Sequence, residues 1–396
     1  MTAAPSITPA VDPELARFRE HYPILASTVY MNSNSMGAMH RSAHAALAEF
    51  ARVWQTEGVE AWETWPGVID ETADSAARLF GGDPGCTTLN QNVAFFEAAI
   101  ASSLDFSKGR NSTRRNRVVM EALQFPNVVY VWERFRELGA ELVLVPSDDG
   151  ITVPLERMLD AIDERTAIVP ISHGIYVSGA LQDVGAICRR ARDVGALTLV
   201  DVYQTLGTVP IDVHAWGADM VTGGSHKWLC GGPGTAFLWV RPGLAERLRP
   251  RTTGWMAHAE PFQFEPAPIR YAANPWRLMG GTPSVPAYYV ARAAFEPLHE
   301  IGVPRIRAHN LALCQIVIDR ALAAGLTVHS PLDGAWRTGF VAVDFPDSRA
   351  VSQQLVAEHY KHDWRPNCGL RIGPHFYSTE EEVHRMMDRV VALARR

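Results

Sequence analysis

From about residue 86, hydrophobic and polar positions along the chain follow two alternating spacings. Short apolar runs, among them "RVVMEAL", "ELVLVP", "TAIVPIS" and "LTLVDV", are separated by stretches whose apolar residues recur at helical spacing. This alternation is typical of an α/β fold in which a mostly parallel sheet lies between helices. Ligands of such sheets bind at the carboxyl ends of the strands, so the loops after each run are the places to look for chemistry.

After about residue 285 the pattern changes. Apolar positions at helical spacing extend over 286–324. Strand-like "LTVHS", "TGFVAVDFP" and "CGLRIG" then alternate with a helix at 348–359 and a last helix from about 379. In the stretch "STEEEV", Ser378 and Glu381 match a capping box at the start of that last helix. These elements predict a second, smaller α+β domain.

The 396 residues suffice for two or three domains, at about 100–200 residues per domain. We expect an N-terminal segment (1–25) that packs with the small domain, a large domain (26–285) and a small C-terminal domain (286–396). The formal charge of −6 argues against nucleic-acid binding, and no apolar run reaches the roughly 18 residues of a membrane helix. The N-terminus lacks a signal pattern, so we expect a cytoplasmic protein. Five dispersed cysteines predict neither a disulfide framework nor a metal site.

Two charged residues follow successive apolar runs. Asp201 ends the strand-like part of "LTLVDV", where a buried carboxylate is costly unless a cation faces it, and Gln204 follows three residues later. Taken alone, Asp201 could equally cap a surface turn. Lys227 stands in "VTGGSHKWLCGGPG", where crowding would lower its pKa and favour a Schiff base. Together they fit pyridoxal phosphate, with Asp201 at the pyridine nitrogen and Lys227 at the aldehyde.

The phosphate of that cofactor needs backbone N–H groups at a helix start, together with side-chain donors. The stretch "LNQNVAFFEAA" supplies such a start at Asn92 and Val93, and Ser225 and His226 precede the lysine. Phe125, in a turn after the run "RVVMEAL", could stack on the cofactor ring. Each feature is weak alone, but their occurrence at successive strand ends favours this cofactor.

Over nearly its whole length the sequence resembles class V of the fold-type-I pyridoxal-phosphate enzymes. "DVYQTLGTVPIDV" and "GGSHKWLCGGPGTAFLWV" are similar to the aspartate–glutamine and serine–histidine–lysine motifs of that group. The resemblance implies the fold-type-I transferase fold, whose large domain has a mostly parallel seven-stranded sheet between helices. It also implies a homodimer whose active sites are shared between the two chains.

Several further stretches resemble kynureninase. They are "VYMNSNSMGAM", "LQFPNVVY", "TGWMAH" with "PFQFE", and "DWRPNCGLRIGPHFY". The resemblance implies that Trp255 reaches a phosphate across a dimer interface. It also implies that Arg371 binds the substrate carboxylate, a role that suits the planar guanidinium fork. Asn34, in the "NSNSMG" turn, could orient the substrate, although turn chemistry alone also explains an asparagine there.

Three positions depart from kynureninase. His226 precedes the lysine in place of a tyrosine, as in cysteine desulfurases. Val128 replaces an aspartate, and Thr282, in "GGTPSV", replaces the asparagine that meets the aromatic substrate. We place Thr282 among the cofactor-binding residues. The resemblance therefore implies the fold and the cofactor but leaves the amino-acid substrate open.

The resemblance implies an enzyme that acts on an L-amino acid through an external aldimine, with the freed Lys227 as proton shuttle. We favour hydrolytic Cβ–Cγ cleavage of kynureninase type or Cβ–S lysis, with class V transamination or epimerisation as alternatives. Cysteine desulfuration needs a mobile nucleophilic cysteine, whereas Cys314 and Cys368 lie in apolar runs typical of core cysteines. The non-enzyme alternative is a cofactor-less regulator on the same fold, which the intact Lys227 and Asp201 disfavour.

Other side chains near the expected site are less informative. Tyr176, in "ISHGIYVSG", could donate a hydrogen bond to a substrate carbonyl. Packing or interface positions explain four others equally well, and their roles stay open: Trp62, Trp65, His173 and His258.

Overall fold

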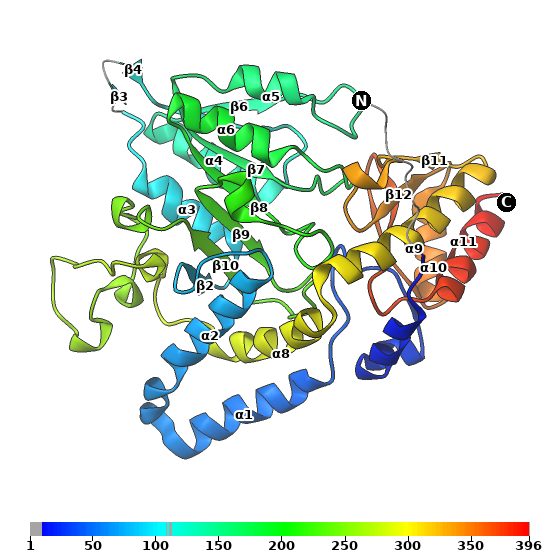
Figure 1. Cartoon of the computed structure of the whole chain (residues 1–396), viewed down its shortest axis with the longest axis horizontal. Coiled ribbons are helices and arrows are strands. Elements are labelled where there is room, and N and C mark those ends of the chain that lie inside the picture. Colours follow the sequence, from blue (N-terminus) through cyan, green and yellow to red (C-terminus); the bar gives the residue numbers. More distant parts are fainter. Residues whose placement is uncertain (1–9, 108, 111–112, 396) are drawn as a thin grey trace.

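A computed structural model describes residues 10–107, 109–110 and 113–395 and shows an α/β fold built on a central seven-stranded sheet (Figure 1). The strand order is β2-β10-β9-β8-β7-β5-β6, and every strand except β10 runs in the same direction. The predicted mostly parallel sheet is therefore confirmed. The strands are β2 (Thr87–Asn90), β5 (Arg117–Glu121), β6 (Glu141–Val145), β7 (Thr166–Ser172), β8 (Leu197–Asp201), β9 (Met220–Gly224) and β10 (Ala236–Val240).

Helices cover both faces of this sheet, because its strands are apolar on both faces. In β5, Val118 and Met120 pack with α3 and α4, whereas Val119 points to the opposite face, which α2, α5, α6 and α8 cover. The helices of this region are α1 (Ser42–Glu57), α2 (Trp65–Arg78), α3 (Val93–Ser103), α4 (Pro126–Arg134), α5 (Leu155–Ala161), α6 (Val184–Val194), α7 (Val213–Trp216) and α8 (Val285–Ile301).

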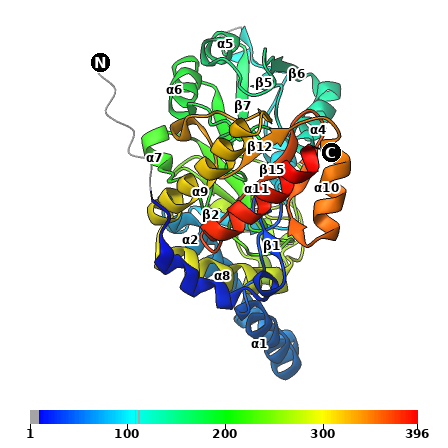
Figure 2. The ribbon, with the colours of Figure 1, turned by 90° about the vertical axis from the view of Figure 1, so that its right-hand side faces the viewer.

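A second, antiparallel sheet of four strands lies beside the large one, with α9 and α11 across the face toward the viewer in Figure 2. Its order is β11-β12-β15-β14, and it shares an apolar core with α9, α10 and α11. Its elements are α9 (Val303–Ala323), β11 (Thr327–Val328), β12 (Val341–Asp344), α10 (Ser348–Ala357), β14 (Asp363–Arg365), β15 (Gly369–Ile372) and α11 (Glu380–Ala394). Two strand pairs stand apart, β1 (Val29–Tyr30) with β13 (Tyr360–Lys361) and β3 (Gly109–Arg110) with β4 (Thr113–Arg114).

The helical stretch predicted over 286–324 is two helices, α8 and α9. They are separated at Gly302, whose φ of +82° a residue with a side chain rarely adopts. Helix α8 packs against α1 and α2 of the large domain. The boundary predicted at residue 285 therefore divides elements that pack together, and we propose Gly302 as the boundary instead.

The capping box of α11 lies one residue later than predicted. The Thr379 hydroxyl accepts the Glu382 N–H at 3.2 Å, and a Glu382 carboxylate oxygen accepts the Thr379 N–H at 3.0 Å. Ser378, the predicted cap, is engaged elsewhere, since its hydroxyl accepts the N–H of His375 at 3.0 Å. The helix consequently begins at Glu380.

The N-terminal segment lies against elements of the second sheet region, while residues 1–9 of the predicted 1–25 segment fall outside the described residues. Asp12 pairs with Arg305 of α9 at 2.6 Å, and Arg19 pairs with Glu382 of α11 at 2.7 Å. The ring of Phe18 contacts the ring of Phe376 edge-on. Strand β1 continues this association by pairing in parallel with β13.

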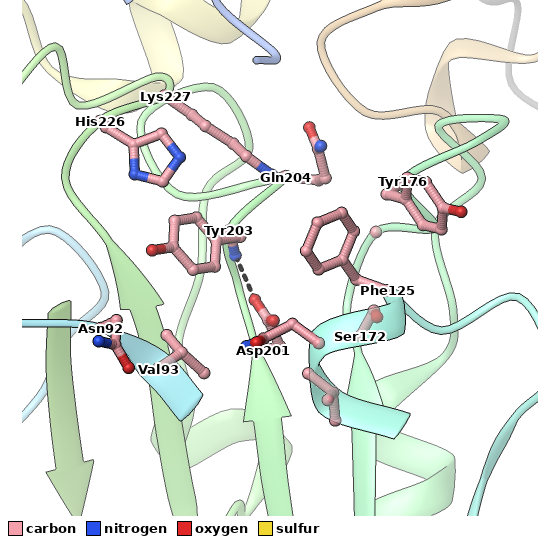
Figure 3. A pocket seen from close by; sticks show the side chains of 13 residues that line it. Asn92, Val93, Phe125, Ser172, Tyr176, Asp201, Tyr203, Gln204, His226 and Lys227 are labelled. Atoms are coloured by element: carbon pink, nitrogen blue, oxygen red, sulfur yellow. Dashed lines mark hydrogen bonds between the residues drawn. The ribbon is translucent and has the colours of Figure 1, made fainter. Parts of the chain in front are cut away.

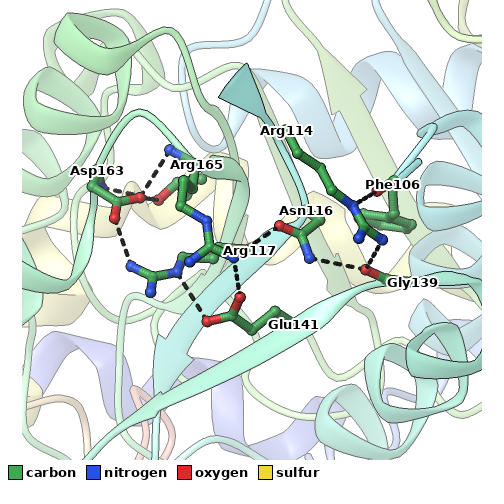
Figure 4. Close-up of polar contacts among 9 residues, drawn as sticks. Phe106, Arg114, Asn116, Arg117, Gly139, Glu141, Asp163 and Arg165 are labelled. Atoms are coloured by element: carbon green, nitrogen blue, oxygen red, sulfur yellow. Dashed lines mark hydrogen bonds and ion pairs between the residues drawn. The ribbon is translucent and has the colours of Figure 1, made fainter. Parts of the chain in front are cut away.

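An ionic cluster fixes the amino ends of three neighbouring strands (Figure 4). Arg117, at the start of β5, contacts Glu141 of β6 at 3.0 Å and Asp163, in the turn before β7, at 2.5 Å. Arg165 also pairs with Glu141. This cluster holds the first residues of the three strands together. The candidate site lies at the opposite edge of the sheet, at the carboxyl ends of the strands.

Candidate active site

A pocket opens at the carboxyl ends of β7 and β8, in the position expected for a ligand of such a sheet. In Figure 3, Lys227 enters it from above and Asp201 from the end of β8 below, with Tyr203 and Phe125 on either side. Eight of the thirteen residues predicted from the sequence line this pocket: Asn92, Val93, Phe125, Tyr176, Asp201, Gln204, His226 and Lys227.

Burial controls the charges of the Asp201 and Lys227 side chains. Desolvation lowers the pKa of Lys227 to about 8, and the nearby Asp201 carboxylate opposes that shift. Desolvation also raises the pKa of Asp201 to about 6, while the Tyr203 N–H and the Lys227 charge act in the other direction. The Tyr203 N–H donates to Asp201 Oδ1 at 2.7 Å and fixes the carboxylate. The pocket thus holds an amine that loses its proton at about pH 8, well below the range of an exposed lysine.

Aromatic rings flank the Lys227 amine. Its Nζ lies 4.7 Å from the centroid of the Tyr203 ring and 5.7 Å from that of Phe125. Tyr203 is a pocket residue that the sequence analysis missed, although its place between Asp201 and Gln204 in "DVYQ" was the available signal. Gly224 makes room for it, because a Cβ there would lie 1.9 Å from the Tyr203 hydroxyl oxygen.

The start of α3 lines one end of the pocket. Asn92 is the N-cap, and its side chain accepts the Phe95 N–H at 3.0 Å. The first amides of α3 have no partner within the helix, and they attract anions such as phosphate. His226 lines the same pocket, and burial lowers its pKa to about 4, so it is neutral there. The predicted Ser225 hydroxyl instead donates to the Gly232 carbonyl at 2.7 Å and does not line the pocket.

Gln204 and Asn34 lie together at the edge of the pocket. Gln204 Nε2 donates to the Asn34 main-chain carbonyl at 3.1 Å. Gln204 Oε1 is buried and has no hydrogen-bond partner among the described residues. The side-chain Oδ1 and Nδ2 atoms of Asn34 are also buried and also lack a partner there. Buried polar atoms of this kind are costly and signal a missing partner. Gln204 Oε1 could accept a hydrogen bond from a ligand hydroxyl.

Arg371 does not line the pocket itself. Its Nε donates to Asp363 Oδ1 at 2.8 Å, its Nη2 contacts Asp363 Oδ2, and its Nη1 donates to the Tyr176 main-chain carbonyl at 2.5 Å. The Tyr176 ring packs edge-on against Phe125 with centroids 5.1 Å apart. Arg371 therefore lies behind the pocket wall that Tyr176 forms.

Two further predicted residues, Trp255 and Thr282, do not line the pocket of their own chain. Trp255 Nε1 donates to Thr282 Oγ1 at 3.4 Å, and the Trp255 ring packs edge-on against Trp62, which in turn packs edge-on against Trp65. This aromatic cluster is separate from the pocket. Two histidines whose roles were left open are also outside it: His173, whose Nδ1 lies 3.0 Å from Thr205 Oγ1, and His258, whose Nδ1 accepts the Glu260 N–H.

Comparison with known proteins decides the family. The model of the aminotransferase class V family matches residues 98–386. The chain belongs to this family. An uncharacterized aminotransferase, YcbU, of Bacillus subtilis (strain 168) is 30% identical to this class V protein, covering 95% of this chain and 97% of the relative. Kynureninase of Pseudomonas fluorescens is 28% identical, and the alignment covers 93% of this chain and 90% of that kynureninase.

Solved structures share the fold of this class V protein. An apo cysteine desulfurase from Thermococcus onnurineus NA1 superposes with a TM-score of 0.85 at 18% identity, covering 98% of this chain and 100% of that chain. The cofactor of the family is pyridoxal phosphate. The pocket fits it, because a buried carboxylate, a desolvated amine and a helix start line one cavity, and Gln204, which lines the same cavity, has an unpaired amide oxygen. Among the described residues, no group of His, Cys, Asp and Glu side chains could hold a metal ion.

Proposed function

We propose that this class V protein cleaves a β-substituted L-amino acid, either by hydrolysis of the Cβ–Cγ bond, as in kynureninase, or by lysis of a Cβ–S bond. The observation that carries the proposal is Lys227, an amine buried between two rings and facing Asp201, with a pKa lowered to about 8. Alignment with kynureninase over 93% of the chain supports the first reaction.

Each pocket residue then has a definite task. Bound pyridoxal phosphate supplies an electron sink that stabilises negative charge at the substrate Cα. Lys227 would hold the cofactor, and its amine would take up the α-proton of the substrate, because a pKa near the working pH suits a general base. Asp201 would hold the cofactor at its ring nitrogen and would keep that nitrogen protonated. Asn92 and the first amides of α3 would bind the phosphate together with His226, and Phe125 would hold the ring.

Cysteine desulfuration is disfavoured by the positions of the thiols. Among the described residues, no cysteine lines the pocket. Burial raises the pKa of Cys368 to about 11 and that of Cys230 to about 12, so neither thiolate is available at neutral pH. Transamination remains the second candidate, and the alignment with a protein named as an aminotransferase favours it.

The deciding experiment incubates the purified holoenzyme with a panel of β-substituted L-amino acids. In Cβ–Cγ hydrolysis, water contributes its oxygen to the departing acyl carbon and a proton ends on Cβ, so alanine and a carboxylic acid are released. Pyruvate and ammonia indicate Cβ–S lysis. Amino-group transfer to an added 2-oxo acid would instead contradict the proposal and establish transamination.

We also propose a cytoplasmic homodimer with shared active sites. Helix α1 projects from the body of the molecule (Figure 2), and Trp54 on it is 61% exposed. Phe264, stacked on Trp255, is 76% exposed. Contiguous exposed apolar patches mark contact surfaces, and we propose that these two rings belong to one. A second chain seated there would allow Trp255 and Thr282 to serve the partner's pocket. No helix of the described residues is long and apolar enough to span a membrane.

A further inference from the structure

The guanidinium of Arg371 already has hydrogen-bond partners within its own chain. Strands β14 and β15 run antiparallel, and their register places Asp363 directly opposite Arg371. The Asp363 carboxylate accepts hydrogen bonds from both Nε and Nη2 of Arg371, and the Tyr176 main-chain carbonyl accepts one from Nη1. The Arg371 side chain is only 3% exposed. A substrate carboxylate that is to bind this fork side-on must therefore replace Asp363.

A second cation, the Arg365 guanidinium, also contacts Asp363. Arg365 lies two residues along β14, on the same face of the strand, and its Nη2 is 2.9 Å from Asp363 Oδ2. Its side chain is 40% exposed, so Arg365 can move where Arg371 cannot. All three charges are close enough to the pocket to affect the pKa of Lys227, which Arg371 and Arg365 lower and Asp363 raises.

The three side chains Arg371, Arg365 and Asp363 together carry a net charge of plus one, which one more anion would neutralise. Arg371 and Arg365 carry two positive charges, and Asp363 carries one negative charge, because the Arg371 fork holds the pKa of Asp363 low against its burial. Two carboxylates around one buried guanidinium would leave an unpaired negative charge, which is costly. With Arg365 included, one added carboxylate makes the trio neutral.

We propose that Asp363 is an internal occupant of the Arg371 fork and passes to Arg365 when the carboxylate of an amino-acid substrate binds Arg371. This inference rests on the proposed function. It makes Asp363 and Arg365 specificity-determining residues. Exchange of one carboxylate for another conserves the charged hydrogen bonds of Arg371, whereas an uncharged amide cannot replace them. The site therefore selects free amino acids over their amides.

The alternative is that Asp363 only orients Arg371 and that Arg365 has no part in binding. The two accounts predict opposite effects. If Asp363 competes with the ligand, its neutralisation strengthens carboxylate binding, and loss of Arg365 weakens it. If Asp363 only orients the fork, its neutralisation weakens binding, and loss of Arg365 changes nothing.

The test measures binding of sodium propionate to the holoenzyme by isothermal titration calorimetry, with propionamide as the uncharged isostere. The variants are Asp363→Asn and Arg365→Met, and Asp388→Asn is the matched control because it removes the carboxylate charge of an Asp–Arg pair between α11 and α9. We expect Arg365→Met to bind propionate about tenfold more weakly, as loss of one charge-assisted hydrogen bond requires. We expect Asp363→Asn to bind it more tightly and the control to match the wild type. Propionamide binding should respond to none of the substitutions.

Either of two results overturns the inference: unchanged propionate affinity in Arg365→Met, or weaker binding in a folded Asp363→Asn. If Asp363→Asn does not fold, Arg365→Met alone decides, since its side chain is partly exposed and its loss leaves the Arg371–Asp363 pair intact. Failure of the proposed function looks different. In that case the substrate panel gives amino-group transfer in place of alanine or pyruvate, while the propionate affinities of the variants still decide the roles of Asp363 and Arg365.

Discussion

At the residue scale, the chemistry depends on how burial sets the charge of a few side chains. Sequence position alone indicated Asp201, Lys227 and Phe125, because each follows an apolar strand and strand ends converge at one sheet edge. It could not indicate that Asp363 would occupy the Arg371 fork, because that contact depends on the register between two strands. It also missed Tyr203, whose ring fits only because Gly224, on the next strand, lacks a side chain.

The lowered pKa of Lys227 predicts how cofactor uptake depends on pH. The neutral amine is the nucleophile, so the rate at which the apo-protein takes up pyridoxal phosphate should rise as the pH passes through about 8. The negative charge of Asp201 raises the pKa of Lys227. Asp201→Asn should therefore shift the inflection to lower pH, by about one unit. Stopped-flow absorbance measures both rates, and an inflection that stays in place or moves upward would refute the coupling.

At the element scale, continuous apolar runs predicted the strands of the large sheet well, because parallel strands buried on both faces are apolar throughout. The break at Gly302 was missed because helical spacing continues on both sides of it. The start of α11 shifted by one residue because Ser378 is engaged by the His375 amide. Local patterns identify elements, and tertiary hydrogen bonds decide where the elements end.

The ionic cluster of Figure 4 should contribute to stability without affecting the pocket. Arg117→Met leaves Asp163 without its guanidinium partner and removes one of the two that hold Glu141. We expect a loss of about 1–3 kcal/mol, seen as a lower melting temperature. The control Arg157→Met, which breaks an exposed pair with Asp148, should leave the melting temperature almost unchanged. Equal melting temperatures for the two variants would show that the cluster does not hold the strand starts.

At the scale of the whole molecule, one chain accounts for only part of the proposed site. The pocket contains the amine, the carboxylate and the helix start, whereas Trp255 and Thr282 lie apart from it. Sequence resemblance implied that Trp255 contributes across a dimer interface, and it placed Thr282 among the cofactor-binding residues. Periodicity within one chain carries no information about such a contact, because the same exposed rings could pack on any apolar surface.

Hybrid dimers test this division of the site. Lys227→Ala removes the amine, and Trp255→Ala removes the ring expected to act in the partner's pocket. Mixed after dissociation and reassociation, the two variants should regain a visible cofactor band at about a quarter of the sites, since each hybrid has one intact site. Absorbance is read at a cofactor concentration that leaves Trp255→Ala unloaded. If mixing restores no band, Trp255 does not act across the interface.

The central claim is that Lys227 is the amine that holds the cofactor. The chain contains only three lysines, Lys108, Lys227 and Lys361, so the assignment can be complete. Borohydride reduction of the loaded protein fixes the cofactor covalently on the lysine that binds it, and peptide mass spectrometry then locates the label. We predict stoichiometric label on the Lys227 peptide and none in Lys227→Ala. Label on Lys108 or Lys361, or full labelling of Lys227→Ala, would contradict the claim.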